Sequence, residues 1–188
     1  MQQLIEPYNP GWKTEFENLK QVFTSVLKAF ETSIQHVGST SIPGMPAKPI
    51  LDIDIIIQHK DIVPPITAQL ESIGYFNKGE QGVAGRFAFR QTNAFVPFST
   101  PSRKWQAHHL YVCLPDSIAL QNHLVFRDAL CNDSQLANRY AALKKSILET
   151  AAVSREEYTK RKTAFVLEVL SAAGMDADQL RQVRQANS

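Results

Sequence analysis

The stretch from His36 to Ile57 reads HVGSTSIPGMPAKPILDIDIII, and it decides most of what can be said about the fold. A short apolar strand runs into a Gly-Ser-Thr-Ser turn. A loop broken by proline and glycine then leads to an apolar run, which we expect to form a strand over residues 50–58. Asp52 and Asp54 occupy alternate positions of that run and therefore share one face of the strand. Two crowded carboxylates repel unless a cation lies between them, so the stretch suggests a metal and nucleotide site.

Each half of this motif also has a simpler structural interpretation. Gly38, Ser39 and Thr40 can present N–H groups and hydroxyls to a phosphate, but no Gly-Lys-Ser/Thr follows, and an ordinary turn would look the same. Asp52 could instead pair with Lys48 or an arginine, while Asp54 reaches solvent at a sheet edge. Burying charge without a partner is costly, whereas Mg²⁺ takes carboxylate oxygens together with substrate phosphates. This favours Asp52 and Asp54 as ligands of Mg²⁺ (or Mn²⁺).

The composition of the 188-residue chain is that of an ordinary globular protein, with 44% apolar residues and 20% charged residues. The formal net charge of +2 gives no reason to expect a nucleic-acid partner or an anionic membrane surface. No run approaches the roughly 20 apolar residues that span a bilayer, and the N-terminus does not resemble a signal peptide. We therefore expect a cytoplasmic protein. Cys113 and Cys131 match no metal-binding spacing and are expected to be buried, reduced thiols.

The remaining pattern predicts a mixed α/β half followed by a helical half. Asn9 is expected to cap a first helix, and a second is expected over 61–73. Further strands are expected over 34–37, 75–78, 86–91 and 107–114. We expect an α+β fold in which residues 1–115 form a core, a mixed sheet with flanking helices. Residues 116–188 are expected to form a helical bundle segment packed on that core.

Helix signals punctuate the second half of the chain. Asp116 is expected to cap a helix ending near Leu130, and Asp133 or Ser134 begins another that ends near Thr150. A capping box at Ser154 predicts a third, ending near Gly174. Beyond residue 176 the polar sequence is compatible with either a short helix or a frayed end.

Ordered motifs along the chain carry a family resemblance. Beside the His36–Asp54 stretch, they are Tyr8-Asn9-Pro10-Gly11-Trp12, Phe126-Arg127-Asp128-x-Leu130, Tyr140-x-x-Leu143-Lys144 and Tyr158-x-x-x-Lys162-x-x-Phe165. The sequence closely resembles the GrpB family, which looks like a branch of the nucleotidyltransferase superfamily with the fold of the catalytic core of DNA polymerase beta. The superfamily signature is Gly-Ser at the start of a helix, then two acids one residue apart on the next strand. Gly38-Ser39 and Asp52-x-Asp54 match it.

One part of the superfamily pattern is missing. A third carboxylate usually comes from a neighbouring later strand, but the segment 107–114 offers His108, His109 and Tyr111 and no acid. His109 is our candidate for a substitute, as a metal ligand or as a general base, because neutral imidazole serves in either role. Without it, the triad is incomplete.

Several cations complete the candidate site. Lys48 lies between the turn and the aspartates, and it is either a solvated loop residue or a phosphate contact. Arg127, Lys144 and Lys162 belong to the family-like motifs on expected helices. Most helix charges face water. If these helices cover the open side of the sheet, however, the three cations would line a cleft that suits a triphosphate. Arg86 and Arg90 share a strand face and are further candidates for anion contacts.

Two functions follow from these residues. The first is a nucleotidyltransferase-like protein that binds a nucleoside triphosphate with Mg²⁺ and transfers a nucleotidyl group to an unknown acceptor. The alternative is a non-catalytic sensor of a nucleotide or phosphorylated metabolite, which the missing third acid favours. A homodimer is left open as a possibility, since the sequence does not reveal the oligomeric state.

Overall fold

The structure, a computed structural model, describes residues 5–149 and 155–186. Five strands form one mixed sheet in the order β1-β2-β5-β4-β3. The strands are β1 (Thr32–Val37), β2 (Leu51–Ile57), β3 (Tyr75–Asn77), β4 (Arg86–Gln91) and β5 (His108–Cys113). The β2–β5 pair is parallel, and the other three pairs are antiparallel. The expected α+β fold with a mixed sheet is confirmed.

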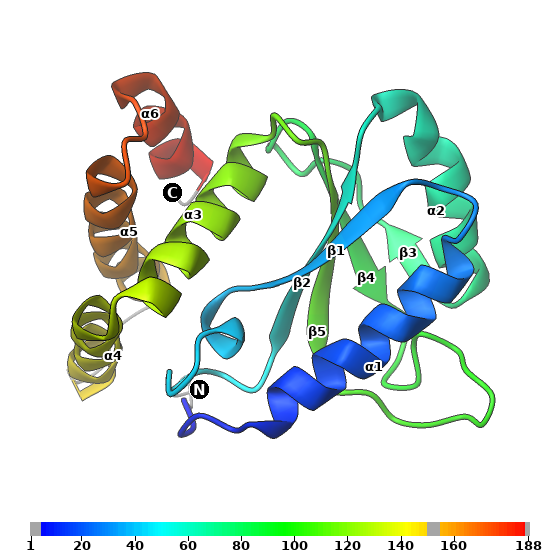
Figure 1. Ribbon diagram of the computed structural model, residues 1–188, viewed down its shortest axis with the longest axis horizontal. Coiled ribbons are helices and arrows are strands. Elements are labelled where there is room, and N and C mark those ends of the chain that lie inside the picture. The colour runs from blue at the N-terminus through cyan, green and yellow to red at the C-terminus, as the bar shows by residue number, and fades with distance from the viewer. Residues whose placement is uncertain (1–4, 150–154, 187–188) are drawn as a thin grey trace.

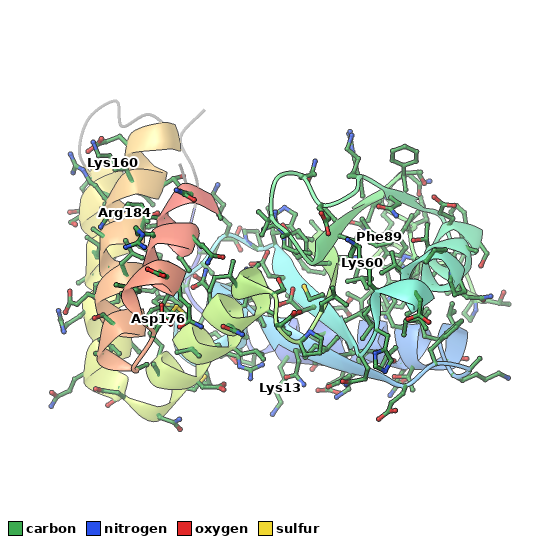
Figure 2. The ribbon with its side chains drawn as sticks, turned by 90° about the horizontal axis from the view of Figure 1, so that it is seen from above. Lys13, Lys60, Phe89, Lys160, Asp176 and Arg184 are labelled. Carbon is green, nitrogen blue, oxygen red and sulfur yellow. The ribbon has the colours of Figure 1, made fainter. Side chains whose placement is uncertain are left out.

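Helices lie on both sides of this sheet. They are α1 (Gly11–Val26), α2 (Val63–Ser72), α3 (Ile118–Asn132), α4 (Ser134–Glu149), α5 (Arg155–Ala172) and α6 (Ala177–Ala186). Short 3-10 turns, η1 (Ser39–Ser41) and η2 (Lys60–Ile62), precede β2 and α2. Figure 1 shows α1 and α2 on one side of the sheet and α3 on the other, with α4, α5 and α6 stacked beyond α3. In the view from above, Lys160 and Arg184 mark this helical half, and Phe89 lies in the sheet half (Figure 2).

The strands alternate between two faces of different chemistry. We define the apolar face by Ile53, Ile55, Phe87, Phe89, Leu110 and Val112, all of them buried. Helix α1 places Trp12, Phe16, Leu19 and Phe23 in the same core cluster, because they recur at helical spacing. We define the polar face by Asp52, Asp54, Arg86, Ala88, Arg90, His109 and Tyr111, which occupy the positions in between. The polar face is therefore the side that can carry a functional site.

A second apolar cluster joins the turn before β2 to the helical half. It consists of Ile42, Met45, Leu130, Tyr140, Phe165 and Val169. These residues come from the loop after η1 and from α3, α4 and α5. The cluster fixes the helices over the Gly-Ser turn. No helix among residues 5–149 and 155–186 is long and apolar enough to cross a membrane.

Three local predictions were wrong. Helix α1 begins at Gly11 with Pro10 as its N-cap rather than Asn9, although Asn9 Oδ1 accepts a hydrogen bond from the Gly11 N–H at 2.8 Å. Helix α3 begins after Ser117 rather than at Asp116, because the Ser117 N–H is already bonded to the Leu114 carbonyl in a preceding turn. Cys131 is exposed near the end of α3, whereas Cys113 is buried on β5 as expected.

The other helix signals agree with the structure where it can be compared. The Asp133 carboxylate accepts hydrogen bonds from the N–H groups of Gln135 and Leu136 at the start of α4. The chain beyond Asp176 forms the helix α6, and Asp176 caps it through the N–H groups of Asp178 and Gln179. The predicted cap at Ser154 lies outside the described residues.

Candidate nucleotide and metal site

Strand β2 places Asp52 and Asp54 side by side on the polar face, but in different surroundings. The Asp52 side chain is 33% exposed, and its Oδ1 accepts a hydrogen bond from His109 Nδ1 at 2.9 Å. Asp54 is fully buried, and its Oδ2 accepts a hydrogen bond from His123 Nδ1 at 2.7 Å. Asp54 therefore does not reach solvent, so that part of the simpler structural interpretation is wrong, and the carboxylate of Asp52 lies against a histidine.

One oxygen of this pair has no partner. Asp54 Oδ1 is buried and makes no hydrogen bond within the described structure. A buried carboxylate oxygen without a partner is costly, and a hard cation would satisfy it. Within residues 5–149 and 155–186, no three His, Cys, Asp or Glu side chains are arranged to hold a metal. The donor set fits Mg²⁺ on condition that phosphate oxygens and water complete the shell, as Mg²⁺ usually requires.

Histidines bracket the two carboxylates. His109 lies opposite Asp52 in the parallel β2–β5 register, so the strand pairing itself positions their hydrogen bond. His123 comes from α3, and the sequence did not point to it as a site residue. Burial opposes its charged form, but the adjacent Asp54 outweighs this and raises the pKa of His123. His123 lies four residues before Arg127, and that helical spacing is the one signal that could have drawn attention to it.

The Gly-Ser turn is in contact with the first aspartate. Gly38 has φ +70° and ψ −172°, a conformation that essentially only glycine adopts. A Cβ at this position would lie 2.2 Å from Asp52 Oδ2. Gly38 is therefore required both by the backbone and by the close approach of the carboxylate.

The three hydroxyls of the turn have different hydrogen-bond partners. Thr40 is buried, and a 2.9 Å hydrogen bond joins its hydroxyl to His36 Nε2. Burial lowers the pKa of His36 to about 4, so this imidazole is neutral at pH 7. Ser41 Oγ donates to the Gly38 carbonyl at 2.6 Å, which closes the turn. The Ser39 hydroxyl accepts a hydrogen bond from a lysine of the helical half.

That lysine is Lys144 on α4. Its ammonium donates to Ser39 Oγ at 3.2 Å and to the Pro46 carbonyl at 2.5 Å, and it lies 4.8 Å from the ring centroid of Tyr140. Burial, with a smaller effect from the charge of Lys162, lowers the pKa of Lys144 to about 7. A buried lysine beside a serine hydroxyl is suited to bind an anion, because a phosphate would restore its preference for the charged form.

The other two predicted cations lie elsewhere. Arg127 on α3 reaches β1, where its Nη1 donates to Gln35 Oε1 and to the His36 carbonyl, both at 3.0 Å. Its Nε bonds Asp128 at 2.7 Å. Lys48 is half-buried on the loop that leads into β2. Of the cations predicted from the sequence, Lys144 thus contacts Ser39, Lys162 is close enough to lower the pKa of Lys144, and Arg127 is held against the outer strand.

The two arginines of β4 share the polar face but have different surroundings. The Arg86 guanidinium lies 4.8 Å from the ring centroid of Tyr111, while Arg90 is exposed. Tyr111 is opposite Asp54 in the register and also near His123. The position where a third carboxylate was expected is therefore occupied by His109 and Tyr111.

The family model described as GrpB protein matches residues 3–172 of this chain. The UPF0157 protein YqkA of Bacillus subtilis is 32% identical over 159 residues, which cover 85% of this chain and 43% of YqkA. The chain thus spans less than half the length of that relative.

Solved structures show the same fold. Conserved protein GrpB from Enterococcus faecalis is similar over 98% of this chain and 100% of its own, with 27% identity and a TM-score of 0.72. Cid1 poly(U) polymerase, solved as a mutant bound to MgATP, covers 88% of this chain and 51% of its own, with 13% identity and a TM-score of 0.52. At that identity the likeness concerns the fold alone, and the fold is nucleotidyltransferase-like.

Proposed function

The chain belongs to the GrpB family, and from that premise we propose that it binds a nucleoside triphosphate with Mg²⁺ and transfers the nucleotidyl group to an acceptor. The observation that carries the proposal is the partnerless, buried Asp54 Oδ1 on the same strand face as Asp52. The fold neighbour Cid1 was solved with MgATP, which supports the same class of ligand for this fold.

The residues divide into two groups in this proposal. Asp52 and Asp54 hold Mg²⁺, which supplies positive charge against the phosphates during transfer. Gly38, Ser39 and Thr40 form the turn that faces the phosphates, with Ser39 in direct contact. Lys144, which bonds Ser39, neutralises phosphate charge, and Lys162 adds to the positive field around it. Lys48 and Arg127 support the edge of this half-site.

His109 is the proposed acceptor of a proton. Its Nδ1 is hydrogen-bonded to Asp52 Oδ1, so the neutral ring leaves Nε2 as a hydrogen-bond acceptor. In the transfer, an acceptor hydroxyl forms a bond from its oxygen to the α-phosphorus, and the bond from that phosphorus to the bridging oxygen breaks. Pyrophosphate leaves, and the hydroxyl proton passes to His109 Nε2.

Calorimetric titration with ATP and the other three nucleoside triphosphates, with and without Mg²⁺, tests the binding half of the proposal. We expect Mg²⁺-dependent binding to the wild type and a loss of at least about tenfold in affinity in Asp52→Asn and Asp54→Asn. Asp61→Asn, on an exposed aspartate before α2, is the matched control. A circular-dichroism melt of each variant separates lost binding from lost folding. Equal binding by wild type and folded Asp54→Asn, or no binding by wild type, contradicts the proposal.

Binding without turnover is the second candidate function. It is favoured by the absence of an acid among the residues of β5 that face Asp52 and Asp54. Incubation with α-³²P-labelled nucleoside triphosphates and a panel of acceptors distinguishes the two functions. Label transfer that His109→Ala abolishes supports the enzyme, and saturable binding with no transfer supports the sensor.

A further inference from the structure

We propose that the acceptor carries a phosphate-like anionic group, and that this group binds in a hollow on the polar face beside His109. The proposal rests on the proposed function, because it assigns a chemistry to the unknown acceptor of that same site. The hollow has a volume of about 440 Å³ and is lined by Lys78, Gln81, Ala88, Arg90, His109 and Tyr111 among others.

The alternation of the strands creates this hollow. Ala88 is opposite Tyr111 in the β4–β5 register, so a methyl group lies on the polar face where neighbouring strands carry long side chains. Phe76 of β3 pairs with Arg90, and Lys78 follows two residues later on the same face. The small side chain of Ala88 therefore leaves space on the polar face, and Lys78 and Arg90 line that space.

The charge of the hollow points to an anion. Lys78 and Arg90 are exposed, and neither has a carboxylate within ion-pair distance among the described residues. None of the lining residues is an aspartate or a glutamate. Lys78 lies 5.8 Å from the ring centroid of Phe76, which is 55% exposed, so its ammonium is kept at the rim. Two unpaired cations beside a hollow are the donors that phosphate requires.

The position of the hollow assigns it to the acceptor rather than to the triphosphate. The Ser39–Lys144 contact lies on the β1 side of the aspartates, whereas β5 and β4, which carry the hollow, lie on the other side. His109 belongs to both regions, because it lines the hollow and hydrogen-bonds Asp52. An in-line transfer needs attacking and leaving oxygens on opposite sides of the phosphorus, so we place the acceptor on the side of the aspartates away from Lys144.

The dimensions favour a small molecule. A volume of about 440 Å³ lies within the range of roughly 300–1,000 Å³ that is typical of small-molecule pockets. A nucleic-acid strand would need a longer basic track, and the chain has a formal net charge of only +2. We therefore assign the hollow to a phosphorylated small molecule, with an RNA 3′ end as the competing outcome of the test.

The test uses inorganic phosphate as the probe, added to the 188-residue chain saturated with Mg²⁺ and a non-hydrolysable ATP analogue. Amide shifts in ¹H–¹⁵N spectra report where phosphate binds and with what affinity. We expect millimolar binding that shifts Ala88, Arg90 and His109, and an affinity at least about tenfold weaker in Lys78→Gln/Arg90→Gln. The matched control Lys28→Gln/Arg181→Gln, on exposed cations elsewhere, should bind phosphate like the wild type. A 15-nucleotide oligo(A) with a free 3′ hydroxyl forms the second arm.

The outcomes separate this inference from the proposed function. If the analogue binds but phosphate does not, or if the double variant binds phosphate unchanged, the inference is wrong while the proposed function stands. If oligo(A) shifts the hollow residues and phosphate does not, the acceptor is RNA and the inference is wrong. If the analogue fails to bind, the proposed function is wrong and the acceptor assignment falls with it. Lys78→Gln/Arg90→Gln should leave analogue binding within about twofold of the wild type.

Discussion

The two faces of the same five-stranded sheet differ in burial and in chemistry. On the apolar face, Ile53, Ile55 and Val112 are 0% exposed and pack in one cluster with α1 and α2. On the polar face, one residue further along each strand, lie Asp52, Asp54 and His109. Along β2 and β5, residues that stabilise the core therefore alternate with residues of the candidate site. Because the side-chain period of a strand is two, one set of hydrogen bonds positions both.

The first way to break this contrast is to remove a side chain from each face of β2. Ile55→Ala should lower the free energy of unfolding by about 2–5 kcal/mol, because it leaves a cavity in the apolar core. Ile56→Ala, its half-buried neighbour on the polar face, should cost less. Urea denaturation of both variants gives the comparison. Equal losses would show that the two faces contribute alike to the core.

A second test sharpens the role of the polar face at the Gly-Ser turn. Gly38→Ala should cost about 1–3 kcal/mol from its backbone conformation alone, and the new Cβ would displace the Asp52 carboxylate. Binding of Mg²⁺ and ATP should fall with it. Gly44→Ala is the control, because Gly44 also has positive φ (+75°) but nothing within 4 Å of its added Cβ. If both variants bind nucleotide like the wild type, Asp52 does not depend on the close approach of Gly38.

The third test concerns the buried Lys144 ammonium that contacts the Gly-Ser turn. Lys144 has a pKa of about 7 when folded and about 10.4 when unfolded, so the unfolded state binds more protons between these values. Its burial penalty is therefore complete below pH 7 and is relieved as the pH rises. We expect the free energy of unfolding to increase by about 2 kcal/mol between pH 7 and pH 9, relative to Lys144→Met. A wild-type curve parallel to that of the variant would contradict the lowered pKa.

Local patterns predicted the parts of the molecule that depend on neighbours in the chain. All five strands lie within the predicted segments or overlap them, because alternation and turn residues are local signals. Alternation also placed Asp52 and Asp54 on one face. The absence of an acid on β5 was visible from the sequence, and the residue that stands there, His109, does lie against Asp52.

Contacts between distant segments were beyond this reasoning. His123 was missed because its bond to Asp54 depends on how α3 crosses the sheet, which no spacing encodes. Arg127 was predicted to line a triphosphate cleft if the helices covered the sheet, and its hydrogen bond to the His36 carbonyl depends on how α3 packs against β1, which the sequence does not show. The different surroundings of Arg86 and Arg90 likewise depend on Tyr111, which comes from another strand and packs against Arg86 alone of the two.

The contact between Arg127 and the His36 carbonyl helps to protect an edge of the sheet from pairing with other chains. β1 is an outer strand, and the unpaired edge of an outer strand can recruit strands from other chains and start aggregation. Here the guanidinium occupies one of the outward backbone acceptors, and α1 and α3 flank the strand (Figure 1). The opposite edge, β3, is three residues long. An intruding strand would have to displace an arginine at one edge and would find too short a template at the other.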